Sequence, residues 1–205
     1  LSSSSAASDV YKRQLLMMAS KFLKINMLSE CRLLFERILK HPNININQQN
    51  MKGMSAFMFA IENCNKYGFC EELKLFITHP KIDINQKTIY GVSTFMLMIQ
   101  KFQNFINFEL LLLFFKKGKI DINEQDQKGC TPLMLVCNNC KDLDLFLFIE
   151  KFLNYPEINV NQQDNSGLSA LMHVLNTDSG SYLLKIITLF LNHPKFDVNQ
   201  RDKRG

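Results

Sequence analysis

Residues 123–137 read Asn-Glu-Gln-Asp-Gln-Lys-Gly-Cys-Thr-Pro-Leu-Met-Leu-Val-Cys, and parts of this stretch recur along the chain at one fixed spacing. Its glycine is one of five that lie 38 residues apart, namely Gly53, Gly91, Gly129, Gly167 and Gly205. Its first asparagine belongs to a second column with the same spacing, namely Asn47, Asn85, Asn123, Asn161 and Asn199. A period of this length, kept without slippage, predicts stacked supersecondary units rather than a single globular core.

The second unit shows how each copy is expected to fold. Its polar stretch 47–53 ends in Gly53, which suits a tight turn that needs a positive φ angle. Ser55 follows, and its hydroxyl can cap a helix by accepting hydrogen bonds from free amide groups. Apolar residues predict this first helix over 56–63 and a second helix over about 70–78. Each unit is therefore predicted to be a turn followed by two helices.

Each second helix is expected to end near a proline and to continue into a short extended link. His79-Pro80 ends the helix in the second unit, because proline disfavours a helical conformation at the residue before it. The link Ile82-Asp83-Ile84-Asn85 alternates apolar and polar residues, and similar links recur in the other copies. Four residues are too few for a regular strand, so each link is predicted to bury two apolar side chains beneath the array.

Recurring apolar columns predict the core. In the first helices these columns are Phe57, Phe95, Leu133 and Leu171, then Met58, Met96, Met134 and Met172, then Ile61, Ile99, Cys137 and Leu175. In the second helices they include Ile38, Phe76, Phe114, Phe152 and Phe190, followed one residue later by Leu39, Ile77, Phe115, Leu153 and Leu191. Because every copy places an apolar residue at these positions, they are expected to be buried.

Length, composition and charge restrict the classes of protein to which the chain can belong. The chain has 205 residues, of which 46% are apolar, so a disordered chain is excluded. The net charge of +5 includes no basic block, which argues against nucleic-acid binding. The longest apolar run, 110–115, is far shorter than the roughly 18 residues of a membrane span. Six cysteines without the spacing of a disulfide scaffold, and without a signal peptide, predict a reducing cytoplasmic or nuclear location.

The columns also predict how the chain divides into a leader and successive repeats. Residues 1–14 match no column and are expected to be a non-native or disordered leader. The array is expected to cover 15–205 and to begin with a partial repeat at about 15–46. Full repeats are predicted at 47–84, 85–122, 123–160 and 161–198. Residues 199–205 match the start of a truncated repeat, so both ends are expected to be cut from a longer array.

The repeats resemble the ankyrin repeat. The stretch 126–134, Asp-Gln-Lys-Gly-Cys-Thr-Pro-Leu-Met, is similar to the family's D-x-x-G-x-T-P-L-H opening, and Asp197-Val198-Asn199 is similar to its D-V-N ending. The resemblance implies an all-α solenoid of stacked helix–turn–helix units joined by hairpin-like turns. The period is 38 rather than about 33 residues, and methionine replaces the family's histidine in all four full units. The extra residues are expected in a longer loop between the helices and in a longer exit at His-Pro.

An ankyrin array implies a protein-binding surface on its concave face, formed by the turn tips and the exposed side of the first helices. The corresponding positions vary between copies, as expected where packing sets no constraint. In this chain they are Met51, Lys52, Met54, Glu62, Asn63, Ile89, Tyr90, Val92, Gln100, Lys101, Gln127, Lys128, Cys130, Asn138, Asn139, Asn165, Ser166, Leu168, Asn176 and Thr177. Met51, Ile89 and Tyr90 form the best patch, because exposed apolar side chains on a rigid turn make good anchors. For any single position, a merely tolerant surface site is the alternative interpretation.

The sequence predicts no metal ligands, no cofactor, no small-molecule substrate and no catalytic residues. Cys137-Asn-Asn-Cys140 has the spacing of half a zinc site, but no second ligand pair follows and Cys137 lies in a core column. His41, His79 and His193 share a column and are expected to close helix C-termini, where a partial negative charge favours them. His173 has no catalytic partner in its neighbourhood, and no catalytic motif is found.

Two functions remain open at this point. The first is a non-enzymatic scaffold that binds a partner protein through the concave face. The alternative is the substrate-targeting arm of a larger multidomain enzyme, such as a kinase or a ubiquitin ligase, whose catalytic part lies outside this chain. A catalytic motif in a longer coding sequence would favour the second.

Overall fold

The computed structural model describes residue 33 and residues 36–42, 44–63, 70–102, 108–118, 120–139, 143–177 and 180–204 of the chain. These ranges contain four helix pairs, and residues 36–39 are helical as well. The pairs are α3 (Ala56–Asn63) with α4 (Cys70–Thr78), α5 (Thr94–Phe102) with α6 (Phe108–Lys117), α7 (Pro132–Asn139) with α8 (Leu143–Leu153), and α9 (Ala170–Leu175) with α10 (Leu183–Leu191). A 3₁₀ turn, η1 (Gly180–Tyr182), leads into α10. The two helices predicted in the second unit are confirmed.

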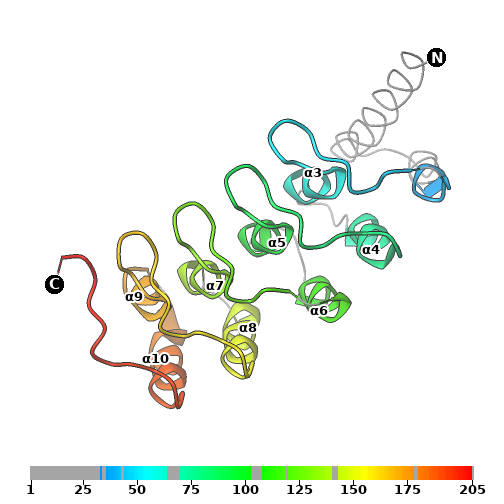
Figure 1. Ribbon diagram of the computed structural model, residues 1–205. Helices are drawn as coiled ribbons and strands as arrows, with labels where there is room; N and C mark the ends of the chain where they lie inside the picture. Colours follow the sequence, from blue (N-terminus) through cyan, green and yellow to red (C-terminus); the bar gives the residue numbers. More distant parts are fainter. Residues whose placement is uncertain are drawn as a thin grey trace.

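The helix pairs stack in a row, and a long loop projects on the same side of each pair (Figure 1). The first helices α3, α5, α7 and α9 contact one another in that order. Among the second helices, α4 contacts α6 and α8 contacts α10. The described residues form isolated bridges, such as Gln49 with Ser55, but no strand. The predicted all-α solenoid of paired helices is therefore confirmed.

A glycine closes each turn because the backbone there is left-handed. Gly53, Gly91, Gly129 and Gly167 have φ angles of 69°, 74°, 77° and 81°, so the predicted positive φ is confirmed. The next turn also comes very close, since a Cβ atom built on Gly129 would lie 2.7 Å from the backbone nitrogen of Asn165. Both the φ angle and this approach favour glycine.

Hydroxyl groups begin most of the first helices. Ser55 caps α3 as predicted, because the amide of Met58 donates to its Oγ atom over 3.3 Å. Ser93 and Thr131 accept the corresponding bonds in α5 and α7, at 3.1 and 3.2 Å. Ser169, in front of α9, makes no side-chain capping bond.

Asparagine side chains join the extended links of neighbouring units. Asn123 donates from Nδ2 to the carbonyl of Glu157 over 2.7 Å and accepts at Oδ1 from the amide of Asn159 over 2.8 Å. Asn47 and Asn161 make the same two contacts with the links that follow them. This position needs one donor and one acceptor on a short side chain, and asparagine provides both.

Phenylalanine rings fill the space between the two layers of helices. Phe57 packs on Phe76 of its own unit with ring centroids 5.1 Å apart, and Phe95 packs on Phe114 at 5.5 Å. The rings also connect units, with centroid distances of 6.1 Å for Phe57 and Phe114 and 6.0 Å for Phe95 and Phe152. All five side chains are buried, as the columns predict. Such ring pairs stabilise the fold beyond the area that they bury.

The core columns hold only in part in the last unit, where Phe190 is buried as predicted but other members are not. Leu175, Leu191 and Val198 are 57%, 56% and 70% exposed, and Leu171 is only half-buried. Most of their equivalents in the preceding units are buried, as Leu153 is at 7% exposure, whereas Phe115 is half-buried. In the described part of the chain no further helix pair packs over this side of α9 and α10, so these apolar side chains remain in contact with solvent.

Some expectations fall on residues outside the described ranges. They are the leader 1–14, most of the partial repeat 15–46, and the longer loops expected between paired helices, such as 64–69. Of the helices that are described, none has the length and apolar character needed to span a membrane.

Candidate functional site

The exposed sides of the turn tips and first helices are here named the turn face. Most of the predicted contact side chains are exposed on it, namely Met51, Lys52, Glu62, Ile89, Tyr90, Gln100, Gln127, Lys128, Asn138, Asn165, Ser166 and Asn176. Six others are half-buried, namely Val92, Lys101, Cys130, Asn139, Leu168 and Thr177. Asn63 ends α3, and its side chain lies outside the described part of the structure.

Met54 is the exception, because the sequence predicts it to be exposed and the structure buries it at 7% exposure. Its amide donates to Asn50 Oδ1 over 3.0 Å, and its carbonyl accepts from the Asn50 amide over 3.0 Å. The turn is thereby closed directly after its glycine, and the side chain lies inward of the tip. Residues of this column therefore form the floor of the turn face rather than its outer edge.

A groove of about 440 Å³ lies on the turn face between the second and third units. Lys52, Glu62 and Gln100 contribute polar groups to its lining, and Phe59 and Leu97 contribute apolar ones. Phe59 and Leu97 are equivalent residues of α3 and α5 that sequence analysis missed as site residues. Their apolar side chains alone could not be distinguished from core residues.

The predicted patch lies beside this groove on two adjacent turns. Met51 is 98% exposed, Ile89 is 53% exposed and Tyr90, which also lines the groove, is 56% exposed. The turns are held by backbone hydrogen bonds, because the amide of Ile89 donates to the carbonyl of Lys52 over 3.1 Å. The amide of Gln127 donates in turn to the carbonyl of Tyr90 over 3.0 Å. The patch is therefore presented on a fixed backbone.

An ion pair joins the third and fourth units beneath the turns. Lys87 Nζ lies 2.9 Å from a carboxylate oxygen of Glu124, whose side chain is only 5% exposed. The hydroxyl of Ser93 donates to the same carboxylate. The equivalent residues at the neighbouring junctions are Gln49 and Gln86, and Gln125 and Gln162, whose side-chain amides donate to backbone carbonyls. The pair was not predicted from the sequence, although Lys87 and Glu124 carry opposite charges in two columns that otherwise contain glutamine.

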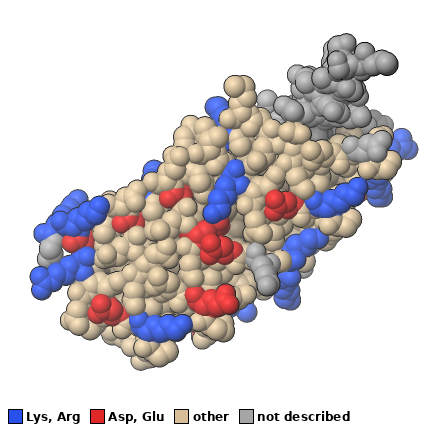
Figure 2. All heavy atoms as spheres, in the orientation of Figure 1, with Lys and Arg blue, Asp and Glu red and all other residues tan. Residues whose placement is uncertain are grey.

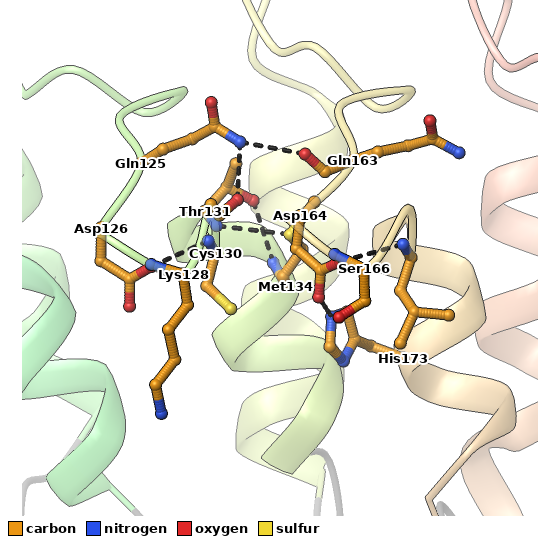
Figure 3. A network of polar contacts seen from close by, with 12 residues as sticks. Gln125, Asp126, Lys128, Cys130, Thr131, Met134, Gln163, Asp164, Ser166 and His173 are labelled. Atoms are coloured by element: carbon orange, nitrogen blue, oxygen red, sulfur yellow. Dashed lines mark hydrogen bonds and ion pairs between the residues drawn. The ribbon is translucent and has the colours of Figure 1, made fainter. Parts of the chain in front are cut away.

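A second polar cluster joins the fourth and fifth units. His173 Nε2 lies 3.0 Å from Asp164 Oδ2, and these side chains are 15% and 8% exposed. The sulfur of Cys130 completes the cluster, in which all three ligand atoms lie within 4.8 Å of one another. Figure 3 shows Cys130 beside one turn, with Asp164 on the next turn and His173 on the helix that follows it. The structure thus supplies the partner for His173 that sequence analysis did not identify.

The Cys130 thiol is not an activated nucleophile. Burial, and then the charges of Asp126 and Asp164, raise its pKa to about 11, and Lys128 opposes them only in part. Reactive cysteines have a lowered pKa, because the thiolate is the nucleophilic form. Together with its neighbours, Cys130 offers a sulfur, an oxygen and a nitrogen donor rather than the elements of nucleophilic catalysis.

The predictions for Cys137, Cys140 and His79 can also be compared with the structure. Cys137 is fully buried in the core, as its column predicts, whereas Cys140 lies outside the described residues. His79 accepts from the amide of Lys81 at Nδ1 over 3.2 Å. Its Nε2 atom is therefore the one that carries the proton and donates to the carbonyl of Leu39 over 3.2 Å. His79 thus closes the second helix of the preceding unit.

Charged side chains of both signs are interspersed on the surface. Figure 2 shows lysine, arginine and acidic residues alternating over the visible face, with basic side chains grouped mainly towards its two ends. The described residues on that face form no continuous basic stripe. A nucleic-acid backbone would require such a stripe.

The comparisons with known proteins support the fold. No family model matches the sequence, and no curated protein matches it. The structure is similar to the crystal structure of EF0377, an ankyrin repeat protein, with a TM-score of 0.73. That match has 17% sequence identity and covers 94% of this chain and 87% of the other. The chain therefore has the ankyrin-repeat fold that its repeats predict.

Proposed function

We propose that this chain is a non-enzymatic scaffold that binds a partner protein through its turn face. The observation that supports this proposal most directly is the exposed patch of Met51, Ile89 and Tyr90 beside the groove between the second and third units. Methionine and aromatic side chains are enriched at protein interfaces, and polar groups commonly surround such anchors. Lys52, Glu62 and Gln100 provide such groups here.

The backbone of the turns favours binding because it is already ordered. Backbone hydrogen bonds connect each described turn to the next, and the two that carry the patch are bonded at 3.1 Å. A partner would therefore meet side chains on a fixed frame, and less conformational entropy would be lost on association. Because the units repeat along one axis, the same frame offers a surface that can span several turns.

The test is a comparison of three baits in a lysate of the source cell, with bound proteins identified by mass spectrometry. The first bait is the full chain, and the second carries alanine at Met51, Ile89, Tyr90 and Lys128. The third is a matched control with alanine at Leu143, Lys151 and Leu184, which are exposed residues of the second helices. All three baits should show similar melting temperatures, because the substituted side chains are exposed.

A partner that binds the full chain and the control but not the turn-face variant is the expected result. A partner retained equally by all three baits would move the binding site away from the patch. A partner lost only with the control bait would place the site on the second helices and contradict the proposal.

A further inference from the structure

The cluster of Cys130, Asp164 and His173 has the composition of a metal site. Cysteine sulfur, histidine nitrogen and carboxylate oxygen are the protein ligands of zinc, and three of them with one open position are typical of sites that retain an exchangeable ligand. Bonds of about 2.0–2.3 Å in a tetrahedron place ligand atoms about 3.3–3.8 Å apart. The observed separations are 3.0 Å for the histidine and aspartate atoms and at most 4.8 Å for the whole group. The observed separations therefore bracket those that a tetrahedral ion requires.

The backbone around the cluster holds these side chains in place. Asp164 Oδ1 accepts from the amides of Ser166 and Leu168 at 2.7 and 3.0 Å, so that its other oxygen is left to face His173. The amide of Cys130 donates to Asp126 Oδ1 over 2.9 Å. The two turns are joined directly by the bond from the Asn165 amide to the Lys128 carbonyl, at 2.9 Å. The ligands are therefore organised by bonds that a metal ion would not need to break.

The other junctions have the same backbone arrangement with different side chains. The positions equivalent to Cys130, Asp164 and His173 are occupied at the two preceding junctions by Met54, Thr88 and Leu97, and by Val92, Asp126 and Leu135. Those sets contain no sulfur–nitrogen–oxygen combination that suits zinc. Among the described junctions, the one between the fourth and fifth units alone carries three ligand types.

We propose that Cys130, Asp164 and His173 bind a divalent metal ion of the zinc class, with one coordination position left open. The local charge is consistent with this proposal. Asp126 accepts a hydrogen bond from the Cys130 amide over 2.9 Å, and Asp164 belongs to the cluster itself, so two carboxylates lie beside the sulfur. The same two carboxylates favour a divalent cation, which replaces the thiol proton when the sulfur becomes a ligand. The ion would tie the fourth and fifth units together at the turn.

The experiment titrates the full, metal-free chain with Zn²⁺ alone and, separately, with Co²⁺ as a spectroscopic substitute. Cobalt bound to this set is expected to show a sulfur-to-cobalt charge-transfer band and the visible bands of a tetrahedral ion. Three variants remove one ligand each with a residue that another unit already carries at that position, namely Cys130→Val, Asp164→Asn and His173→Leu. Each should weaken Zn²⁺ binding by at least the roughly 10–100-fold that loss of a supporting group alone costs.

The matched control replaces the other cysteine pair, as Cys137→Ile together with Cys140→Ser. It should retain the cobalt spectrum and the affinity of the unaltered chain. Zn²⁺ should also raise the melting temperature of the unaltered chain and of the control but not that of the three ligand variants. Melting of each metal-free variant shows separately that it folds. The proposal is overturned if saturating Co²⁺ gives no charge-transfer band, or if the band survives in the ligand variants and disappears in the control.

Discussion

Gly129 shows how one position ties two units together. Its φ angle of 77° is unfavourable for any residue with a Cβ atom, and such an atom would approach Asn165 of the next turn. Gly129→Val is therefore expected to lower the free energy of unfolding by at least about 1–2 kcal/mol. Lys128→Ala, on the exposed neighbouring residue, should change it by less than about 0.5 kcal/mol. Equal melting temperatures for the two variants would contradict the assignment of the turn.

The ion pair of Lys87 and Glu124 gives a second prediction about single residues. Lys87→Gln leaves the buried carboxylate of Glu124 with Ser93 as its remaining partner, and is expected to cost about 1–3 kcal/mol. Adding Glu124→Gln should recover most of that loss, because it removes the buried charge, and the neighbouring junctions carry glutamine at both positions. Chemical denaturation of the wild type, both single variants and the double variant forms the required cycle. Additive effects of the two substitutions would show that the ions do not interact.

Cys130 provides a prediction about pH. Its pKa is raised from 9.0 to about 11 mainly by burial and then by Asp126 and Asp164, so the thiol stays protonated where an ordinary cysteine begins to ionise. With a chelator present, alkylation of Cys130 should be slow at pH 9 and should accelerate as the pH approaches about 11. The folded state also binds this proton more tightly than the unfolded chain does. This contribution to stability is therefore present below pH 9 and is lost as the pH rises through about 11.

The alkylation rate is measured by mass spectrometry of the peptide that contains Cys130. Asp164→Asn should move the rise in rate to lower pH, because it removes one of the negative charges that disfavour the thiolate. An alkylation midpoint near pH 9 in the unaltered chain would contradict the raised pKa.

At the scale of helices, the ring of Phe152 connects three neighbours in the core. It is fully buried, and its centroid lies 5.0 Å from that of Phe148, 5.7 Å from that of Phe115 and 6.0 Å from that of Phe95. Phe152→Ala is expected to lower the free energy of unfolding by about 3–5 kcal/mol, since it removes a large side chain and leaves a cavity. Leu184→Ala on α10, at a side chain that is 75% exposed, is the control and should have little effect. Similar denaturation midpoints for these two variants would contradict the packing.

The helices and the turns were the features that the sequence predicted best. Periodicity and the turn glycine were enough to place α3 and α4 and the positive φ angles, because both depend on residues close together in the chain. The burial of Met54 was not predicted, since the direction of its side chain depends on how the closed turn packs. The meeting of Cys130 with His173 was also missed, because they are separated by 43 residues and meet only where two units stack.

For the whole molecule, stability should differ between units, because each unit depends on its neighbours. The first helix α7 has contacts with both α5 and α9, whereas Leu184 and Leu191 of α10 are 75% and 56% exposed. Amide groups of α10 are therefore expected to exchange with deuterium faster than those of α7 under native conditions. Hydrogen exchange read by mass spectrometry tests this order. Equal protection of both helices would indicate a single cooperative unit instead.

The asparagines that join the links also make the array sensitive to slow hydrolysis of their side-chain amides. Spontaneous hydrolysis of the Asn123 amide to a carboxylate would replace the donor with an acceptor, and two oxygens would then face each other where the Glu157 carbonyl now accepts a hydrogen bond. The same reaction at Asn47 or Asn161 would remove the corresponding hydrogen bond at another junction. Old molecules would thus accumulate weakened contacts between neighbouring units, and the units beside an altered asparagine would unfold more readily, because each unit depends on its neighbours for stability.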